Sequence, residues 1–318
     1  MQIKSILRPY RDIIYAFYGF LYDFYRFARY AGYYGFVKDK EKRDYKAVKI
    51  YHRLEKSLSF RKRNAVSGRR AVKDLMDLLR RGDAGLGRGF QECVAINVLH
   101  KFADQSSLDL CKKEVPRQCN WVDPALGGVV EITYQDLSVG KLDSPEGFFY
   151  SRHSVRDFSS RSVPHHIIKR SVELSLKAPS VCNRQAWYVY HVDDRSLMNQ
   201  ILSFQNGNAG FGHEIPSLLI VASDIKAFDT AGERYQHWID GGVFAASLVY
   251  ALHSLGLGSC CLNWSKTPGD DLRLRKAVPI KPHHTIIMML AVGYPNERIK
   301  VCGSPRRPLH YFYEYWGS

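Results

Sequence analysis

Two arginines, a histidine and a serine lie close together at residues 152–156 and could bind an anion. Arg152 and Arg156 carry guanidinium groups that donate charge-assisted hydrogen bonds, and Ser154 lies between them with a hydroxyl. His153 adds a further donor beside Ser154. This donor set suits a phosphate group, although a solvated surface turn can have the same composition.

A second polar patch falls on an irregular stretch at residues 178–187. Loops that are held between rigid elements often gather binding groups, and this one offers hydroxyl and amide side chains. An ordinary capping turn would use the same residue types to satisfy backbone groups. The candidate binding residues here are Pro179, Ser180, Asn183 and Gln185.

Two further patches lie nearer the C-terminus. Residues 256–264 read Gly-Leu-Gly-Ser-Cys-Cys-Leu-Asn-Trp, and adjacent side chains in a strand alternate between its two faces, so one cysteine should line the site and one should lie in the core. A basic pair follows at positions 306 and 307. The candidates from these two patches are Cys261, Leu262, Asn263, Arg306 and Arg307.

The elements around these patches predict an α+β fold. A helix should open near Pro164 and end before Pro179, and β-rich runs at 187–192, 217–222 and 285–292 predict strands. Residues 240–255 are apolar with almost no charge, which predicts a helix buried all round, either as a core element or at a subunit interface. This order favours a mixed sheet with helices on both faces.

The first 145 residues predict a separate, basic and mainly helical extension. Apolar residues have helical spacing in 43–63, 69–81 and 91–103, and a glycine- and proline-rich stretch places the boundary near residue 145. We therefore expect an extension at 1–145 and a second domain at 146–318. Residues 1–90 hold 22 Lys and Arg against 9 Asp and Glu, a net charge of +13.

The tyrosine-rich residues 13–36 could lie on a membrane surface. Charged residues such as Asp23 and Arg26 interrupt this stretch before the ~20 apolar residues that a membrane span requires. Tyrosine rings and flanking arginines are nevertheless common at membrane interfaces. The alternative is a helix that packs on its own protein or on a second subunit.

Cysteine and histidine usage predicts neither a disulfide framework nor a metal site. The seven cysteines include no Cys-x-x-Cys pair and the N-terminus lacks a secretory signal, so we expect reduced thiols in a cytoplasmic protein. Peripheral contact of residues 1–90 with an anionic membrane is compatible with that location. The histidine pairs at 165–166 and 283–284 are adjacent in sequence and should not converge on one metal ion.

Taken together, the four patches resemble those of the FMN-dependent nitroreductase family. That family shares an Arg-x-Ser-x-Arg/Lys start, an Ala-Pro-Ser-x-x-Asn-x-Gln-Pro-Trp segment, a Gly-Leu-Gly strand entry and a late basic pair. The order and spacing fit residues 148–313, about half of the chain. Ala186 replaces the usual proline of the second patch, and Ser304 leaves one cation fewer beside Arg306 than some relatives have.

The resemblance implies how an FMN cofactor would be held. Arg152, Ser154 and the pair Arg306 and Arg307 would bind its phosphate. Arg156 would face the pyrimidine edge of the flavin, where the reduced ring carries negative charge.

The other two patches would meet the flavin ring. Pro179, Ser180, Asn183 and Gln185 would approach it from the second subunit of a nitroreductase-like homodimer. The segment from Cys261 to Asn263 would run under the ring, with a backbone N–H directed toward flavin N5. No catalytic side chain is implied, because the flavin itself carries the hydride.

The implied activity is that of an NAD(P)H-dependent FMN oxidoreductase. NADH or NADPH would donate hydride, and a small electrophilic acceptor such as a nitroaromatic, quinone or enone would take it in a ping-pong reaction. The alternative is a basic adaptor at a membrane or nucleic acid with a non-catalytic flavin-fold domain, which the charge of residues 1–90 motivates. No nucleic-acid-binding motif is recognisable in the sequence.

Overall fold

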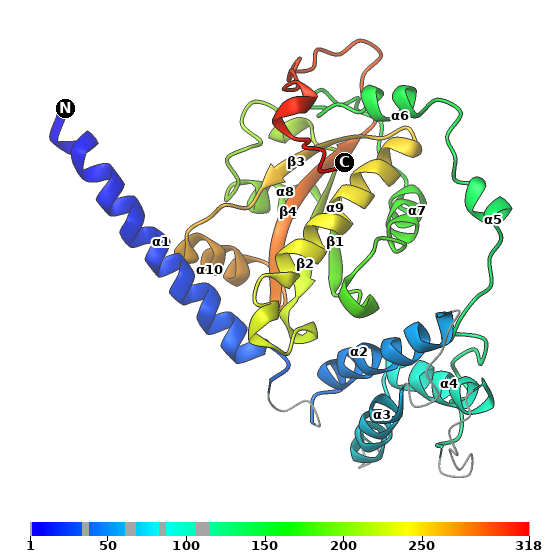
Figure 1. Cartoon of the computed structure of the whole chain (residues 1–318). Helices are drawn as coiled ribbons and strands as arrows, with labels where there is room; N and C mark the ends of the chain where they lie inside the picture. The colour runs from blue at the N-terminus through cyan, green and yellow to red at the C-terminus, as the bar shows by residue number, and fades with distance from the viewer. Residues whose placement is uncertain (1, 34–37, 61–67, 83–86, 106–114, 318) are drawn as a thin grey trace.

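The computed structural model describes residues 2–33, 38–60, 68–82, 87–105 and 115–317. Parts of the tyrosine-rich stretch at 13–36 and of the expected helix at 43–63 lie outside the described residues. A four-stranded sheet occupies the centre of the C-terminal half, and helices from the N-terminal half lie to one side of it (Figure 1).

The central sheet is antiparallel in all four of its strands. These are β1 (Trp187–Val192), β2 (Ser217–Asp224), β3 (Gly258–Asn263) and β4 (His284–Gly293), in the order β1-β2-β4-β3. In the described part of the chain, parallel pairing is confined to one isolated bridge, between Ser154 and Ser259. The α+β class expected from the sequence is therefore confirmed. Of the parallel pairing expected in a mixed sheet, the described residues show this one bridge.

Each face of the sheet is covered by helices. One face packs on α9 (Gln236–Ser254) and α7 (His165–Ser175), and Phe244, Leu248 and Leu252 meet Leu219, Val221 and Leu290 there. The other face packs on α8 (Arg195–Leu202) and α10 (Pro268–Ala277). Two apolar layers enclosing a sheet are the usual way for an α+β domain to bury both of its faces.

Helix α9 has one buried face and one exposed face. Gly241 lets the helix approach β4 closely, because a Cβ there would lie 2.5 Å from the Ile287 side chain. On the opposite side Trp238, Ile239 and Val243 are exposed, Ile239 at 55%. The expectation that this helix is buried all round is therefore wrong for a single chain, because apolar composition does not reveal which neighbours are present.

The N-terminal half contains a helical unit with its own apolar core. Helices α2 (Lys40–Ser59), α3 (Arg69–Gly82) and α4 (Phe90–Gln105) bury Leu54, Leu75, Leu79 and Leu99 completely. A fully buried ion pair between Arg43 and Glu92 ties α2 to α4 at 3.0 Å. Two short helices, α5 (Tyr134–Ser138) and α6 (Pro145–Ser151), then lead toward the sheet.

A disulfide bond within this unit corrects one expectation. Cys93 on α4 and Cys119 are paired, which closes a loop with a sequence separation of 26 residues. The expectation that all thiols are reduced is wrong for this pair. Sequence spacing could not show it, because the partners share no motif and meet only after α4 and the 115–122 segment have packed together.

Salt bridges join the helical unit to the sheet domain. Lys46 and Lys49 on α2 both reach Asp229, and Lys49 also pairs with Glu233 at 3.0 Å. The buried Arg184 binds Glu233 from the other side at 2.7 Å. This cluster of opposite charges holds the pKa of Glu233 down at about 2, even though burial alone would raise it.

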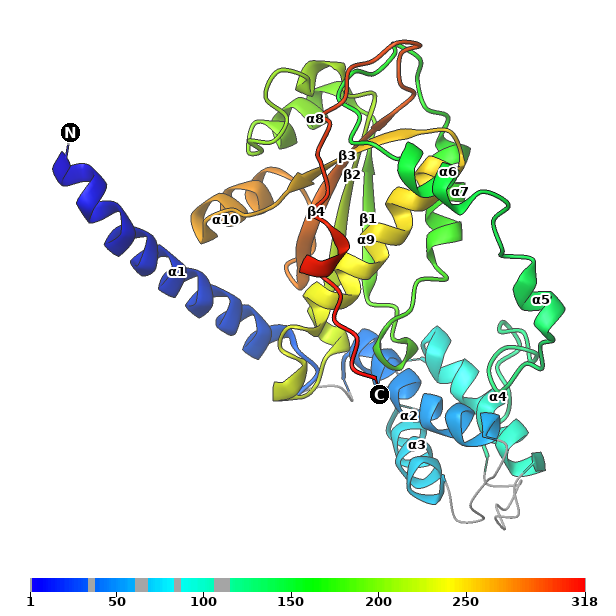
Figure 2. The same cartoon turned by 45° about the horizontal axis from the view of Figure 1, so that its top comes forward.

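Helix α1 (Gln2–Tyr30) docks by its C-terminal half and projects with its N-terminal half (Figures 1 and 2). The Tyr22 hydroxyl donates to Asp271 at 2.7 Å, and Arg26 donates to the carbonyl of His284 at 2.7 Å. On the outward face Ile13, Phe17, Phe20 and Phe24 are 60–72% exposed. In the described part of the chain, no helix has the length and apolar character needed to cross a membrane.

Candidate cofactor site

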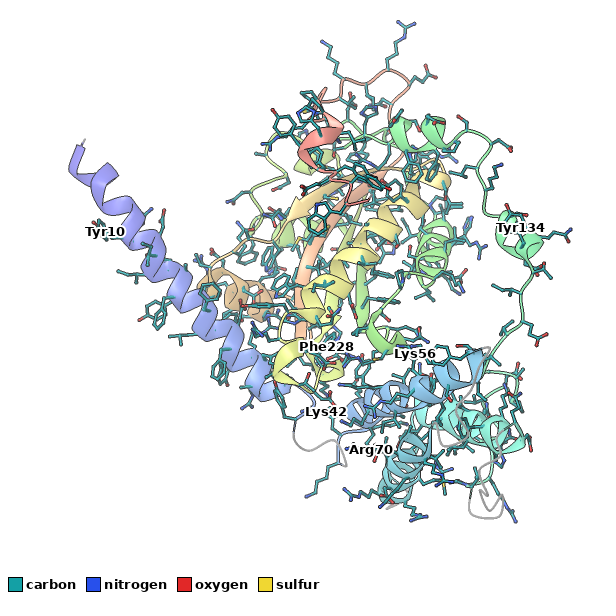
Figure 3. All side chains as sticks on the ribbon, in the orientation of Figure 1. Tyr10, Lys42, Lys56, Arg70, Tyr134 and Phe228 are labelled. Atoms are coloured by element: carbon teal, nitrogen blue, oxygen red, sulfur yellow. A yellow bond between two sulfur atoms is a disulfide. The ribbon has the colours of Figure 1, made fainter. Side chains whose placement is uncertain are left out.

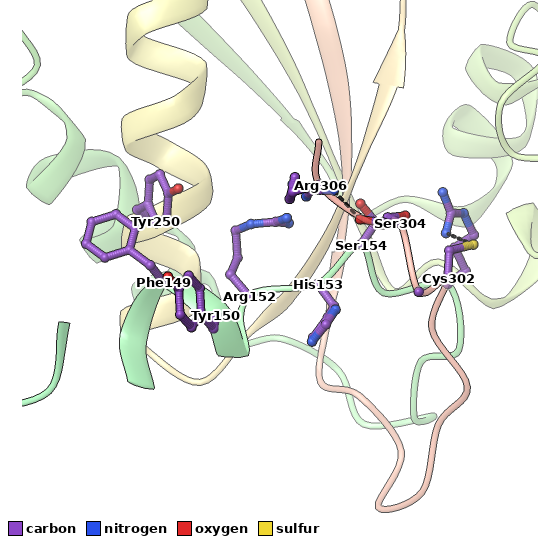
Figure 4. A pocket seen from close by; sticks show the side chains of 11 residues that line it. Phe149, Tyr150, Arg152, His153, Ser154, Tyr250, Cys302, Ser304 and Arg306 are labelled. Atoms are coloured by element: carbon purple, nitrogen blue, oxygen red, sulfur yellow. Dashed lines mark hydrogen bonds between the residues drawn. The ribbon is translucent and has the colours of Figure 1, made fainter. Parts of the chain in front are cut away.

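A cavity of about 440 Å³ opens at the C-terminal end of α9 (Figure 4). The predicted residues Arg152, His153, Ser154, Arg156 and Arg306 all line it. They come from two segments that are about 150 positions apart in the chain, so the fold brings the first and fourth sequence patches together. Ser304, noted in the fourth patch, lines it as well. The sequence did not indicate the other lining side chains, which are Phe149, Tyr150, Tyr250 and Cys302.

Backbone contacts hold the arginine segment against the edge of the sheet. Helix α6 ends at Ser151, directly before Arg152, and the Val155 N–H donates to the Ser259 carbonyl at 3.0 Å. Gly258 makes this approach possible, because a Cβ at that position would lie 2.8 Å from the Val155 side chain. The glycine of the Gly-Leu-Gly entry is thus needed for close packing of the strand on the arginine segment.

The electrostatics of the cavity favour an anion. Among the described residues, no carboxylate lines it, whereas three guanidinium groups do. The Arg156 guanidinium lies 3.5 Å from the Cys302 sulfur, and Arg306 donates to the carbonyl of Ser304. For Arg152, the described part of the chain shows no ion pair with a carboxylate. A cationic, hydroxyl-bearing cavity without acidic residues fits a phosphate group.

The third patch lies on β3, with alternating sides. Cys261 and Asn263 face the side of the sheet that carries α9 and are exposed, whereas Leu262 points to the other side and is buried. Partial burial raises the pKa of the Cys261 thiol, an effect that the nearby Arg152 charge opposes. A ligand in the cavity could therefore extend along Cys261 and Asn263, and only the backbone of Leu262 could touch it.

The second patch lies at the other end of α9. The Val181 N–H donates to the Asp240 carboxylate at 3.2 Å, whereas Tyr250 lines the cavity ten positions further along the helix. At 1.5 Å per residue this corresponds to about 15 Å. Pro179, Ser180, Asn183 and Gln185 therefore do not reach the cavity within one chain. Asn183 and Gln185 adopt positive φ angles of 53° and 52° in a tight turn.

The fourth patch divides its two cations. Arg306 lines the cavity, whereas the Arg307 guanidinium lies over the Tyr311 ring at 6.0 Å and does not line it. The sequence could not show which of the two arginines faces the cavity, because the segment 294–308 has no helix or strand to fix the direction of its side chains.

Two adjacent histidines and an aspartate form a buried cluster apart from the cavity, which differs from the arrangement expected from the sequence. His283 and His284, which were expected not to converge, both lie near Asp224, with Nδ1 of His283 2.8 Å from a carboxylate oxygen and Nε2 of His284 3.9 Å from the other. His283 precedes β4 and His284 begins it, so the two side chains do not obey strand alternation. Burial lowers the pKa of His284 to about 4.

The fold and the cavity together define an α+β domain with a cationic cavity at one edge of its sheet. Residues 150–294 match the model of the nitroreductase family. This segment is therefore a nitroreductase-family domain, with a nitroreductase-like fold, and the resemblance inferred from the four patches is confirmed.

The chain is also similar to curated proteins and to solved structures. An NADH dehydrogenase of Thermus thermophilus is 24% identical over 46% of this chain and 84% of its own length. Iodotyrosine deiodinase 1 of Homo sapiens is 24% identical over 50% of this chain and 63% of its own length. An FMN-dependent nitroreductase from Clostridium difficile R20291 is 20% identical, with a TM-score of 0.43, and covers 50% of this chain and 91% of that one.

Proposed function

We propose that this protein is an FMN-dependent oxidoreductase that transfers hydride from NADH or NADPH to a small electrophilic acceptor. The observation that carries the proposal is the cavity lined by Arg152, Arg156 and Arg306 without any carboxylate. Arg152, Arg306 and the Ser154 hydroxyl would bind the FMN phosphate. Arg156 would face the pyrimidine edge, where its fixed positive charge favours the electron-rich state of the ring.

Residues of β3 would orient the ring. Cys261 and Asn263 offer an exposed strand face next to the cavity, and a backbone N–H near Asn263 would donate to the ring atom that carries the hydride. When bound, FMN supplies the redox chemistry by accepting a hydride from NAD(P)H and delivering it to a nitroaromatic, quinone or enone. Donor and acceptor would react with the flavin in turn, so the kinetics would be ping-pong, and solvent supplies the proton that completes the reduced acceptor.

The domain would act as a homodimer with each flavin site shared between subunits. The predicted ring contacts Ser180, Asn183 and Gln185 lie about 15 Å along α9 from the cavity of their own chain. The exposed apolar face of α9, which lies between these residues and the cavity, supports a subunit interface on this helix. We propose the division at residues 145 and 146, with the helical unit as an extension of the catalytic domain.

A visible absorption spectrum of the purified full chain tests the main proposal. We expect flavin bands that bleach when NADPH or NADH is added without oxygen and that return when a quinone follows. A colourless protein that FMN does not reconstitute would contradict the cofactor assignment.

A second proposal concerns the outward face of α1, which would lie on an anionic membrane. Ile13, Phe17, Phe20 and Phe24 form an exposed apolar stripe at helical spacing. Arg70 at the start of α3 is exposed, and Figure 3 shows Tyr10 on the projecting part of α1 at the left of the molecule and Arg70 on the helical unit below the sheet domain. This arrangement, with the net charge of +13 in residues 1–90, supports peripheral attachment of a cytoplasmic protein.

Vesicle binding tests this attachment. We expect the full chain to float with vesicles of phosphatidylcholine and phosphatidylserine at low salt and to be released at high salt, since salt screens exposed charges. Phe20→Glu should weaken binding by about tenfold or more, because it removes one large side chain from the apolar face. Tyr134→Glu on α5, where the tyrosine is 83% exposed, is the matched control. Absence of binding at low salt would remove the proposal.

A further inference from the structure

A second cavity lies between α1 and the sheet domain and has a volume of about 260 Å³. Gly19, Tyr22 and Arg26 form its wall on α1, at helical spacing on the side opposite the exposed apolar stripe. Trp238 at the start of α9 and the run from Asn263 to Lys266 after β3 form the other walls. Aromatic rings and polar groups thus meet in a concave site, which is typical of small-molecule binding.

The wall contributed by α1 is firmly held. The Tyr22 hydroxyl and the Trp264 indole N–H both donate to Asp271, at 2.7 and 2.9 Å. Arg26 is buried and donates to the carbonyls of His284 and Pro282. Burial and the bond to Asp271 raise the pKa of Tyr22 to about 12, so this hydroxyl stays protonated. The cavity is therefore a preformed feature of the folded chain.

Strand β3 connects the two cavities along one face. Ser259 pairs with Ser154 beside the cationic cavity, and Asn263, four residues further along the strand, lines the second one. At 3.3 Å per residue the separation is about 13 Å. Cys261 and Asn263 face the same side as α9, so the exposed face of β3 runs from the first cavity to the second.

We propose that the second cavity binds the acceptor, and that α1 supplies one wall of that site from the same chain. This inference rests on the proposed function, because it takes the cofactor to occupy the first cavity and the face of β3. The acceptor class is a small, uncharged aromatic compound of one or two rings with nitro or quinone oxygens.

The chemistry of the walls selects this class. Tyr22 and Trp238 offer aromatic faces for a planar ring. Two cations, Arg26 and Lys266, are balanced by the carboxylates of Asp23 and Asp271, so the cavity has no excess of charge that would favour an ionic ligand. Lys266 lines the cavity together with Asn263, and its ammonium, which donates to Asn206 at 2.9 Å, can donate to an oxygen of the acceptor.

Binding can be measured without turnover. Trp238 and Trp264 line the cavity, so saturable quenching of tryptophan fluorescence by 4-nitrobenzyl alcohol reports its occupation. Gly19→Phe should weaken this binding by about tenfold or more, because a Cβ at Gly19 meets no atom within 4 Å and the added ring fills the open space. Ala28→Phe is the matched control, since Ala28 is exposed on the outward side of the same helix.

The outcomes separate the two proposals. Gly19→Phe should keep its thermal stability, because glycine is a poor helix former, and Lys266→Met should weaken binding without filling the cavity. If flavin is bound and reduced in every variant but quenching saturates equally in Gly19→Phe and Ala28→Phe, the acceptor site is wrong and the proposed function stands. If FMN never binds, the proposed function and the acceptor role both fail.

Discussion

At the scale of single residues, the structure distinguishes two of the arginines predicted to bind the phosphate. Arg152 lines the cavity without a carboxylate partner among the described residues, whereas Arg307 lies over Tyr311. A guanidinium bound to a phosphate contributes about 2 kcal/mol. We expect Arg152→Ala to raise the Kd for FMN by about 30-fold in a fluorescence titration of the apoprotein. Arg307→Ala should change it less than about threefold, and equal losses in both variants would contradict the assignment.

A buried histidine should make stability depend on pH. His237 stacks on Phe27 and is 6% exposed, and its Nδ1 has no hydrogen-bond partner in the described structure. Burial, with help from Arg26, lowers its pKa from 6.5 to about 4. The folded state thus holds the neutral ring, so above pH 6.5, where the unfolded chain also holds it neutral, His237 does not lower the stability. As pH falls from 6.5 toward 4 the unfolded chain takes up the proton first and stability is lost.

The size of this effect can be isolated with one variant. A shift of this size corresponds to at most about 3 kcal/mol. We expect His237→Phe to show a smaller loss of unfolding free energy between pH 6.5 and 4 in urea titrations. Burial raises the pKa of the Asp44 carboxyl to about 6, which acts in the opposite direction in both proteins. The measurement is therefore the difference between the two proteins in how unfolding free energy changes with pH. Parallel pH curves for the two proteins would refute the role of His237.

At the scale of elements, the Cys93–Cys119 disulfide should stabilise the helical unit. It closes a loop of 26 residues, and cross-linking such a loop restricts the unfolded chain by about 3 kcal/mol. We expect a reducing agent to lower the urea midpoint by a corresponding amount, and Cys93→Ala to make the protein insensitive to reductant. Alkylation under non-reducing denaturation should label two thiols fewer than after reduction. Labelling of all seven cysteines without reductant would show that the bond does not form.

The local sequence pattern predicted most of the helices and strands but few of the contacts between them. The expected strands at 187–192 and 285–292 correspond to β1 and to all but the end residues of β4, because β-branched runs bounded by turns are a local signal. Helix α10 was missed because its charged sequence has no clear apolar stripe, although Thr267 caps it and Pro268 opens it.

The residues of the candidate site were likewise predicted where a short motif marks them and missed where distant elements meet. Arg152, Ser154, Arg156 and Arg306 were named from short motifs, and the structure brings them into one cavity. Phe149 and Tyr250 were missed because they meet only when α6 packs on α9, with their rings 5.2 Å apart. The wall formed by α1 depends on contacts across more than 240 positions, such as Tyr22 to Asp271, for which the sequence carries no local signal.

At the scale of the whole molecule, a single chain leaves apolar surface that a second copy could cover. Ile239 and Val243 are exposed on α9, and the C-terminal segment crosses the same side of the molecule (Figures 1 and 2). In that segment Phe312 is 69% exposed and Trp316 is 88% exposed. Aromatic side chains clustered beside an apolar helix face are typical of a subunit interface.

Mixing two impaired variants tests whether the site is shared between subunits. Arg152→Ala should damage the cavity, and Gln185→Ala should damage the partner's contribution, so each homodimer would have two impaired sites. A mixed dimer would combine one doubly impaired site with one intact site. Refolding equal amounts together should therefore restore about a quarter of the wild-type number of sites, since half of the dimers are mixed. If both residues served the same chain's site, mixing would restore nothing, and the separation of Gln185 from the cavity would need another explanation.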